Sequence, residues 1–226
     1  MSLTIIHNLA IITARDLNEA WWLCIRAVLQ HGREYVIDSG SYAGQKRKEL
    51  DFVVVEIEKP STRPLIPTVP EGLPSPTSME YVENDYLSYL MTSAKKEGEL
   101  YTYGEDIEPQ YAKAVEILRT GNTNQACISV GNKNSIFLEH SQCLRVIDMR
   151  TMNNKLHYYI YFRSWDLLAG FPSNLAGIQL MKELMAWELG IQDGQLIAVS
   201  KGLHLYDYSW TLGQAISGLP ESCYNL

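Results

Sequence analysis

Apolar residues recur at helical spacing in several segments of the chain. The clearest segment spans 16–30, where apolar side chains return every three or four positions and Gly32 follows as a stop signal. A second strong segment, 173–189, predicts an amphipathic helix that ends at Gly190. Weaker patterns predict helices over 77–92, with Thr77 or Ser78 as the cap, over 108–120 and over 208–216.

Strand patterns are clearest in the second half of the chain. Residues 143–149 and 156–162 are rich in β-branched and aromatic side chains, and Asn153-Asn154 between them is typical of a turn. These two segments therefore predict a hairpin. Further strands are predicted over 52–57, 126–130 and 196–199. Because helices and strands are mixed without a regular βαβ rhythm, the pattern favours the α+β class.

A proline-rich segment interrupts this pattern in the first half. Six of the nine prolines fall between Pro60 and Pro76, which predicts a long extended loop over about 59–77. A loop of this length inside a compact domain is often functional. The 226 residues fit one large domain, so we expect a single domain over 1–226.

Composition excludes several classes of function. A net charge of −7 argues against a nucleic-acid binder, and no stretch approaches the roughly 20 apolar residues of a membrane helix. The first 14 residues lack the positive start of a secretory signal. The cysteines are scattered without metal-ligand spacing, so we expect no metal site, a cytoplasmic location and free thiols. They are Cys24, Cys127, Cys143 and Cys223.

Chemically suggestive residues form a spaced set in the second half. Gln142-Cys143 is followed by RSWDLLAGFPSN at 163–174 and by HLY at 204–206. Each short motif alone is weak evidence, but five matching positions in the same order are strong evidence. Counted from Cys143, they lie 20, 23, 31, 61 and 63 residues downstream: Arg163, Asp166, Asn174, His204 and Tyr206.

This ordered set resembles the thymidylate synthase family over roughly 126–208, and the short chain with its proline-rich loop is similar to the compact archaeal branch. The resemblance implies a large bent mixed β-sheet covered by helices, with a homodimer formed through the sheet face. It also implies methylation of dUMP at C5 to give dTMP. The donor would be 5,10-methylenetetrahydrofolate or a methanopterin analogue, with no metal and no flavin.

The family match assigns the chemistry to three residues. Cys143 would add as a thiolate to C6 of the pyrimidine, which requires positive charge nearby to lower its pKa. Arg163 would supply that charge and also bind the nucleotide phosphate. Tyr103, followed by Gly104, resembles a family Tyr-Gly pair near the base and a proton-relay water. The alternative for Cys143 is an ordinary buried thiol.

Other matches concern substrate binding. Asn174 offers a donor and an acceptor, which suits O4 and N3–H of uracil, although a helix N-cap is the alternative. His204 and Tyr206 resemble the pair that binds the sugar 3′-hydroxyl, and on a strand they would share one face. A satisfied structural histidine is the alternative for His204. Ser164 resembles a phosphate ligand, or is a strand-end hydroxyl that faces solvent.

Two further matches concern the pterin. Asp166 resembles the carboxylate that orients the pterin ring, since a carboxylate can accept from an amino group and a ring N–H together. Its alternative is a helix or turn cap. Gly170 matches a glycine that lets the backbone approach the co-substrate.

The sequence departs from the family pattern at three places. Leu144 stands where the family has His, and Phe162 stands where it has Gln. Asn124-Gln125 takes the place of two arginines that reach the phosphate across the dimer interface. Phosphate binding would then depend on Arg163 and on 45–47, for which a solvated charged turn is the alternative.

Several assignments stay open on sequence alone. The family's general acid/base carboxylate could be Glu80, Glu83 or Asp85, and the aromatic wall over the one-carbon intermediate could be Tyr86 or Tyr89. Exclusion of water at that stage decides between methyl and hydroxymethyl products. A pyrimidine-nucleotide hydroxymethylase is therefore one alternative function, and a non-catalytic nucleotide-binding relative is another.

Overall fold

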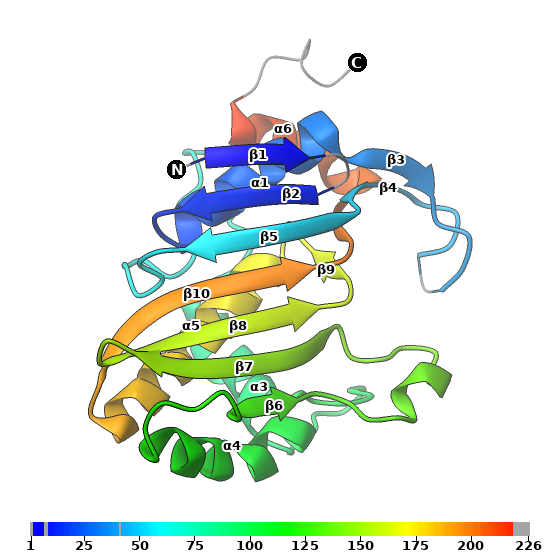
Figure 1. Ribbon diagram of the computed structural model, residues 1–226. Helices are drawn as coiled ribbons and strands as arrows, with labels where there is room; N and C mark the ends of the chain where they lie inside the picture. The colour runs from blue at the N-terminus through cyan, green and yellow to red at the C-terminus, as the bar shows by residue number, and fades with distance from the viewer. Residues whose placement is uncertain (1, 7–8, 41, 219–226) are drawn as a thin grey trace.

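A seven-stranded mixed sheet is the largest element of the computed structural model, which describes residues 2–6, 9–40 and 42–218. Parallel and antiparallel pairs alternate across its centre (Figure 1). This confirms the α+β class and the large mixed sheet. In spatial order the strands are β1 (Ser2–Ile6), β2 (Leu9–Ala14), β5 (Phe52–Ile57), β10 (Gln192–Ser200), β8 (Lys155–Phe162), β7 (Leu144–Met152) and β6 (Cys127–Ser129).

A second, smaller sheet lies beside the end of the large one. Its four short strands, in spatial order, are β3 (Arg33–Val36), β4 (Lys46–Leu50), β11 (Leu203–Tyr206) and β9 (Trp165–Asp166). The segment 45–48, for which a solvated turn was the alternative, is therefore mostly strand. The chain passes from β8 directly into β9, and from β10 directly into β11, so the two sheets share their connections.

The helices lie behind the large sheet in Figure 1, and no described helix covers its front face. Side chains alternate along the strands between fully buried positions toward the helices and half-exposed positions on the front. The front positions include apolar side chains such as Ile11, Val54 and Ile197. This is the face through which a dimer was predicted, and dimerisation stays a prediction. The helical segments are α1 (Leu17–His31), α2 (Met79–Tyr81), η1 (Val82–Tyr86), α3 (Leu87–Met91), α4 (Gly104–Arg119), η2 (Ser135–Phe137), α5 (Gly170–Leu189), η3 (Asp207–Ser209) and α6 (Trp210–Ser217).

Local signals explain the elements that were predicted correctly. Helix α1 begins where the Asp16 carboxylate accepts from the Glu19 N–H at 3.0 Å, and it ends at Gly32. In the β7–β8 hairpin, Asn153 and Asn154 adopt positive φ angles of 52° and 59°, which asparagine tolerates better than most residues. The proline-rich segment is confirmed as irregular backbone.

Helix α4 begins at Gly104, four residues before the predicted start at 108. The reason is a capping box. The Thr102 hydroxyl accepts from the Glu105 N–H at 3.2 Å, and the Glu105 carboxylate accepts from the Thr102 N–H at 3.1 Å. Pro109 lies inside the helix, in its second turn.

Helix α5 begins at Gly170, three residues before the predicted start, and it is not amphipathic. It contacts the large sheet on one side and α1, α3 and α4 on the other. Its side chains are consequently buried around most of its circumference, including the polar Gln179 and Lys182. The abundance of apolar residues in this segment, more than their spacing, is therefore what indicates a buried helix.

The segment 77–92 is helical as predicted, with an irregular centre. The Ser78 hydroxyl caps it by accepting from the Tyr81 N–H at 3.1 Å. The turn η1 is a π-helix, which inserts one extra residue and rotates the side chains that follow. No described helix is long and apolar enough to cross a membrane.

Candidate active site

Cys143 immediately precedes strand β7 and is half-buried. The Arg163 side chain binds the loop before it: Nε donates to the Gln142 carbonyl at 3.1 Å and Nη2 to the Ser141 carbonyl at 2.6 Å. The Arg163 backbone N–H donates to the Cys143 carbonyl at 2.9 Å. The hairpin therefore brings the predicted nucleophile and the predicted cation together.

The thiol is less activated than the sequence predicted. Burial raises the pKa of Cys143 above its ordinary value, and the nearby Arg163 guanidinium opposes this rise without cancelling it. Arg163 already donates two hydrogen bonds to backbone carbonyls, so part of its charge is directed away from the sulfur. The expectation of a lowered pKa is therefore wrong for the protein without substrate.

A cluster of tyrosines surrounds this thiol. The Tyr103 hydroxyl accepts from the Leu144 N–H at 3.3 Å, one residue from the sulfur. The ring centroids of Tyr89 and Tyr103 lie 5.0 Å apart, and Tyr101 and Tyr86 extend the cluster. Burial raises the pKa of all four hydroxyls, so they stay neutral. The surroundings of the thiol are thus polar but poor in charge.

Two departures from the family pattern explain each other. Leu144 and Phe162, which replace His and Gln, lie directly opposite one another in the β7–β8 ladder. Both side chains are fully buried. An apolar cross-strand pair therefore replaces a polar one, and neither residue leaves an unpaired polar partner behind. This substitution also contributes to the apolar surroundings of the neighbouring thiol.

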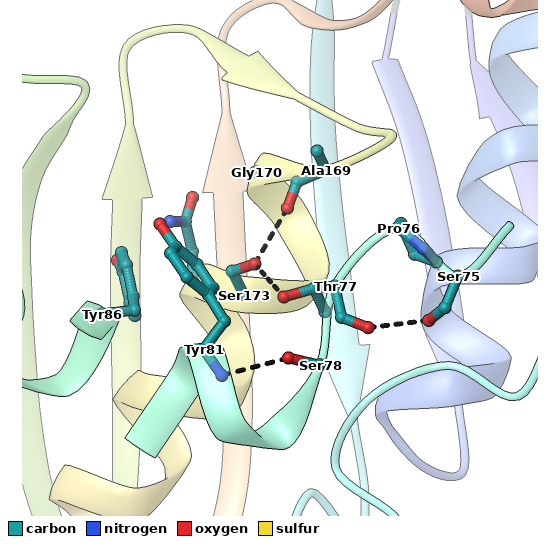
Figure 2. A pocket seen from close by; sticks show the side chains of 10 residues that line it. Ser75, Pro76, Thr77, Ser78, Tyr81, Tyr86, Ala169, Gly170 and Ser173 are labelled. Atoms are coloured by element: carbon teal, nitrogen blue, oxygen red, sulfur yellow. Dashed lines mark hydrogen bonds between the residues drawn. The ribbon is translucent and has the colours of Figure 1, made fainter. Parts of the chain in front are cut away.

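An open cavity of about 620 Å³ lies next to the thiol centre. Its walls come from 75–86, after the proline-rich loop, and from 169–174 at the start of α5 (Figure 2). The Ser173 hydroxyl connects the two walls, because it is hydrogen-bonded to the Thr77 hydroxyl at 2.8 Å and to the Ala169 carbonyl at 3.1 Å. Cys143 does not line this cavity, but Tyr86, which does, lies close to both Cys143 and Asn174.

Asn174 projects into the cavity from the second turn of α5. Its Oδ1 accepts from the Trp165 indole N–H at 2.9 Å. Because an indole N–H only donates, this bond fixes which end of the amide is oxygen and leaves the NH₂ group to donate elsewhere. Trp165 is itself held between Phe162 and Phe171, at ring distances of 4.2 and 4.4 Å. The N-cap alternative is wrong, because Asn174 lies inside the helix.

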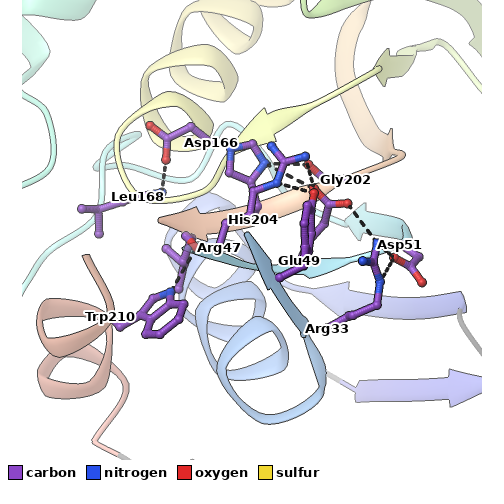
Figure 3. Close-up of polar contacts among 11 residues, drawn as sticks. Arg33, Arg47, Glu49, Asp51, Asp166, Leu168, Gly202, His204 and Trp210 are labelled. Carbon is purple, nitrogen blue, oxygen red and sulfur yellow. Dashed lines mark hydrogen bonds and ion pairs between the residues drawn. The ribbon is translucent and has the colours of Figure 1, made fainter. Parts of the chain in front are cut away.

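Asp166 lies beside Gly170, which lines the cavity. The Asp166 Oδ1 accepts from the Leu168 N–H at 3.0 Å (Figure 3), and burial raises the pKa of this carboxyl. One of the two Asp166 carboxylate oxygens therefore caps a turn, which was the alternative to binding the pterin. A Cβ at Gly170 would meet only ordinary contacts, the nearest at 3.4 Å. Protein packing does not require glycine here, which leaves approach of a ligand as a reason for it.

His204 is buried on β11, at 2% exposure. Its Nδ1 lies 2.9 Å from the Gly202 carbonyl, so the proton sits on Nδ1 and Nε2 is an acceptor. That Nε2 is buried and has no hydrogen-bond partner among the described residues. Burial lowers the pKa of His204 to about 4, and the ring stays neutral. The Tyr206 ring contacts it at 4.8 Å, so the two side chains share one face as predicted.

An ion-paired network supports His204 from strand β4, and no motif in the chain announces it. The Glu49 carboxylate pairs with Arg47 at 2.9 Å, accepts from the Tyr35 hydroxyl at 3.0 Å and lies 3.9 Å from Arg33 (Figure 3). It also lies 4.0 Å from the His204 Nδ1. Because two guanidinium groups already share this carboxylate, it does not keep His204 protonated.

Backbone pairing joins these groups into one site. Strands β9 and β11 run parallel, with Asp166 opposite His204, and the Leu167 N–H donates to the His204 carbonyl at 2.9 Å. Ser164 is half-exposed at the junction of β8 and β9. Asn124-Gln125, by contrast, is exposed just before β6.

The candidate general acid/base carboxylates point elsewhere. Glu80 and Glu83 are exposed, and Asp85 pairs with Lys96. None of the three lines the cavity that contains Asn174. Within the described part of the chain, no group of three or more His, Cys, Asp or Glu side chains could hold a metal ion.

Comparison with known proteins agrees with this geometry. The family model described as thymidylate synthase matches residues 94–215, which include Cys143 and its spaced partners from Arg163 to Tyr206 but not the candidates at 45–47 and 80–89. A relative from Methanosarcina acetivorans, named provisionally as a thymidylate synthase, is 26% identical over 215 residues, 91% of this chain and 94% of its own length. A relative from Methanopyrus kandleri with the same provisional name is 20% identical over 87% of this chain and 93% of its own. The thymidylate synthase of Listeria monocytogenes serotype 4a is 30% identical over 106 residues, 46% of this chain and 33% of its own.

Proposed function

Because the chain belongs to the thymidylate synthase family, we propose that it methylates dUMP at C5 to give dTMP, through a covalent bond between Cys143 and C6 of the pyrimidine. The observation that carries this proposal is that Cys143 and Asn174 both lie close to Tyr86. A nucleophile and a base-reading amide within one side chain of each other suit a reaction on a pyrimidine ring. The archaeal relatives share the short chain over nearly their whole length.

Each predicted residue has a role consistent with its surroundings. The amide NH₂ of Asn174, held in place by Trp165, is free to donate to O4 of uracil, and its Oδ1 retains a second lone pair for N3–H. The acceptor Nε2 of His204 suits a sugar hydroxyl, with Tyr206 beside it. Arg163 and Ser164 would bind the phosphate, and Tyr103 would stand near the reacting carbon.

Activation of the thiol must accompany substrate binding. Since burial raises the pKa of Cys143 in the protein alone, the thiolate is a minor species at neutral pH. A nucleotide phosphate that engages Arg163 would draw the guanidinium away from the carbonyls of Ser141 and Gln142. The loop that carries Cys143 would then be free to adjust.

A methylene-pterin would supply the one-carbon unit and the reducing equivalents. Asp166 and Gly170 are the residues we propose to hold it, whether it is methylenetetrahydrofolate or a methanopterin analogue. We further propose a cytoplasmic homodimer that pairs through the open face of the large sheet. The three described cysteines are free thiols, as a reducing compartment would keep them.

The direct test is covalent trapping. The purified protein is incubated with 5-fluoro-dUMP and methylenetetrahydrofolate, and its intact mass is measured. We expect a ternary adduct that maps to Cys143. Cys143→Ala should form none, whereas Cys127→Ala, which removes an exposed thiol elsewhere, should react like the wild type.

The outcomes separate the parts of the proposal. An adduct with nucleotide alone would support the nucleophile and the base and would point to a different pterin. A folded protein that forms no adduct with any donor would contradict the proposed reaction and favour the non-catalytic alternative.

A further inference from the structure

The Tyr86 hydroxyl is a buried polar group without a partner. The residue is 5% exposed, and its oxygen lies close to the Asn174 amide but makes no hydrogen bond of acceptable geometry within the described structure. Tyr86 nevertheless lines the open cavity, beside Asn174 and Gly170 (Figure 2). A hydroxyl that is removed from water without a partner is costly unless a ligand satisfies it. Its position next to the base-reading amide indicates which ligand that is.

Two features hold Tyr86 in this position. It is the last residue of the π-helical turn η1, and such turns redirect side chains at functional sites. Its ring also packs against the backbone of Gly177 on α5, where a Cβ would come within 2.5 Å of a ring carbon. The orientation of the hydroxyl is therefore built into both helices.

The same turn directs the neighbouring carboxylates away. Asp85 pairs with Lys96, and Glu83 is exposed. No carboxylate is found among the described residues that line the cavity. Tyr86 is thus a neutral proton-bearing group on the cavity wall that lies close to both Asn174 and Cys143.

We propose that the Tyr86 hydroxyl donates a hydrogen bond to O4 of the bound pyrimidine and stabilises the negative charge that appears there when Cys143 adds to C6. The inference rests on the proposed function. In this step the sulfur electron pair forms the S–C6 bond, and the C5=C6 pair moves to give an enolate at C4–O4. Tyr86 keeps its proton throughout.

This role suits a neutral hydroxyl in a charge-poor site. Burial raises the pKa of Tyr86 well above the working range, so it is a donor at every pH at which the enzyme operates. A preoriented donor stabilises a reaction most where charge develops in its transition state. Asn174 would fix which base binds, and Tyr86 would respond to the transition state.

Tyr86→Phe tests the inference, with Tyr111→Phe as its matched control. The control removes a hydroxyl that binds Glu188, away from the cavity. The assay is tritium release from [5-³H]dUMP, which follows adduct formation with or without a pterin. We expect kcat to fall roughly 10²- to 10³-fold in Tyr86→Phe with little change in KM, as when one oxyanion donor is lost. Tyr111→Phe should retain its activity.

Thermal unfolding separates a catalytic role from a structural one. Because the hydroxyl has no hydrogen-bond partner within the described structure, Tyr86→Phe should melt at the same temperature as the wild type or higher. A variant with near-normal kcat would overturn the inference, and so would one whose loss of activity matches a loss of stability. If the wild type neither releases tritium nor forms the Cys143 adduct, the proposed function fails, and this inference fails with it.

Discussion

The two ends of the candidate site are built from different chemistry. Around Cys143, the segments η1, α3 and 101–103 supply neutral tyrosine hydroxyls, and the β7–β8 hairpin supplies an apolar Leu144–Phe162 pair followed by one arginine. Around His204, the small sheet supplies a carboxylate shared by Arg47 and Arg33. Charge is balanced at the second end and nearly absent at the first.

This difference separates positioning from reactivity. Paired charges on short strands hold side chains in fixed places, which suits recognition of a sugar hydroxyl. A charge-poor pocket raises the pKa of its thiol and leaves each hydrogen-bond donor strong, which suits a reaction whose charge appears only in the transition state. The following predictions test whether the two ends differ in this way.

The largest effect on stability is expected from Glu49→Ala. The Glu49 side chain is 10% exposed, and its partner Arg47 is 21% exposed. Removal of the carboxylate leaves the Arg47 guanidinium partly buried and unpaired, which should cost about 3–5 kcal/mol in the free energy of unfolding. Urea denaturation at pH 7 measures it.

Asp51→Ala is the matched control. Asp51 binds Arg33 at 2.9 Å, but its side chain is 36% exposed. An exposed pair contributes less than about 1 kcal/mol. If the two variants lose equal stability, the Glu49 network is not the buried, positioning element that the comparison requires.

The next-largest effect is a loss of stability at acid pH. His204 has a pKa of about 4 in the folded protein, against about 6.5 when unfolded. Between these values the unfolded chain binds a proton that the folded protein does not. The stabilisation is therefore complete above pH 6.5 and is lost as the pH falls toward 4, by up to about 3 kcal/mol.

Comparison of wild type with His204→Gln isolates this contribution, because acidic residues whose pKa is lowered, such as Glu183, titrate in both proteins. The difference between their free energies of unfolding should shrink as the pH falls from 7 to 4. A difference that stays constant would mean that His204 is protonated in the folded state, in contact with Glu49.

The two ends of the candidate site also differ in how far the sequence alone predicts them. The residues at 143–174 could be predicted because they are close in sequence and follow a family spacing, and the hairpin and α5 carry strong local signals. The Glu49 network was missed, since β3 and β4 are short, polar strands that depend on pairing, β3 with β4 and β4 with β11. Strands β1 and β2 were also missed, although their sequences are apolar and rich in β-branched residues. The inward turn of Tyr86 depends on a π-helix that no local pattern signals.

A smaller effect distinguishes two glycines of α5. In Gly177→Ala, the new methyl group would lie 2.5 and 2.7 Å from ring carbons of Tyr86, which should cost about 1–3 kcal/mol and move the hydroxyl. Gly170→Ala meets ordinary contacts and should leave the melting temperature nearly unchanged. Its activity should fall only if a co-substrate passes close to this backbone. Equal melting temperatures for both variants would contradict the packing that orients Tyr86.

The smallest effect expected is on the reactivity of the thiol itself. Since burial raises the pKa of Cys143 and Arg163 opposes the rise, iodoacetamide should alkylate it slowly at pH 7.5, and the rate should increase about tenfold per pH unit to beyond about pH 9. Arg163→Gln should slow the reaction several-fold at each pH. Cys127 is exposed, so it is replaced by serine, as is Cys223, which lies outside the described residues; Cys24 is fully buried. A rate that levels off below about pH 8 would show that the charge-poor end activates its thiol without substrate.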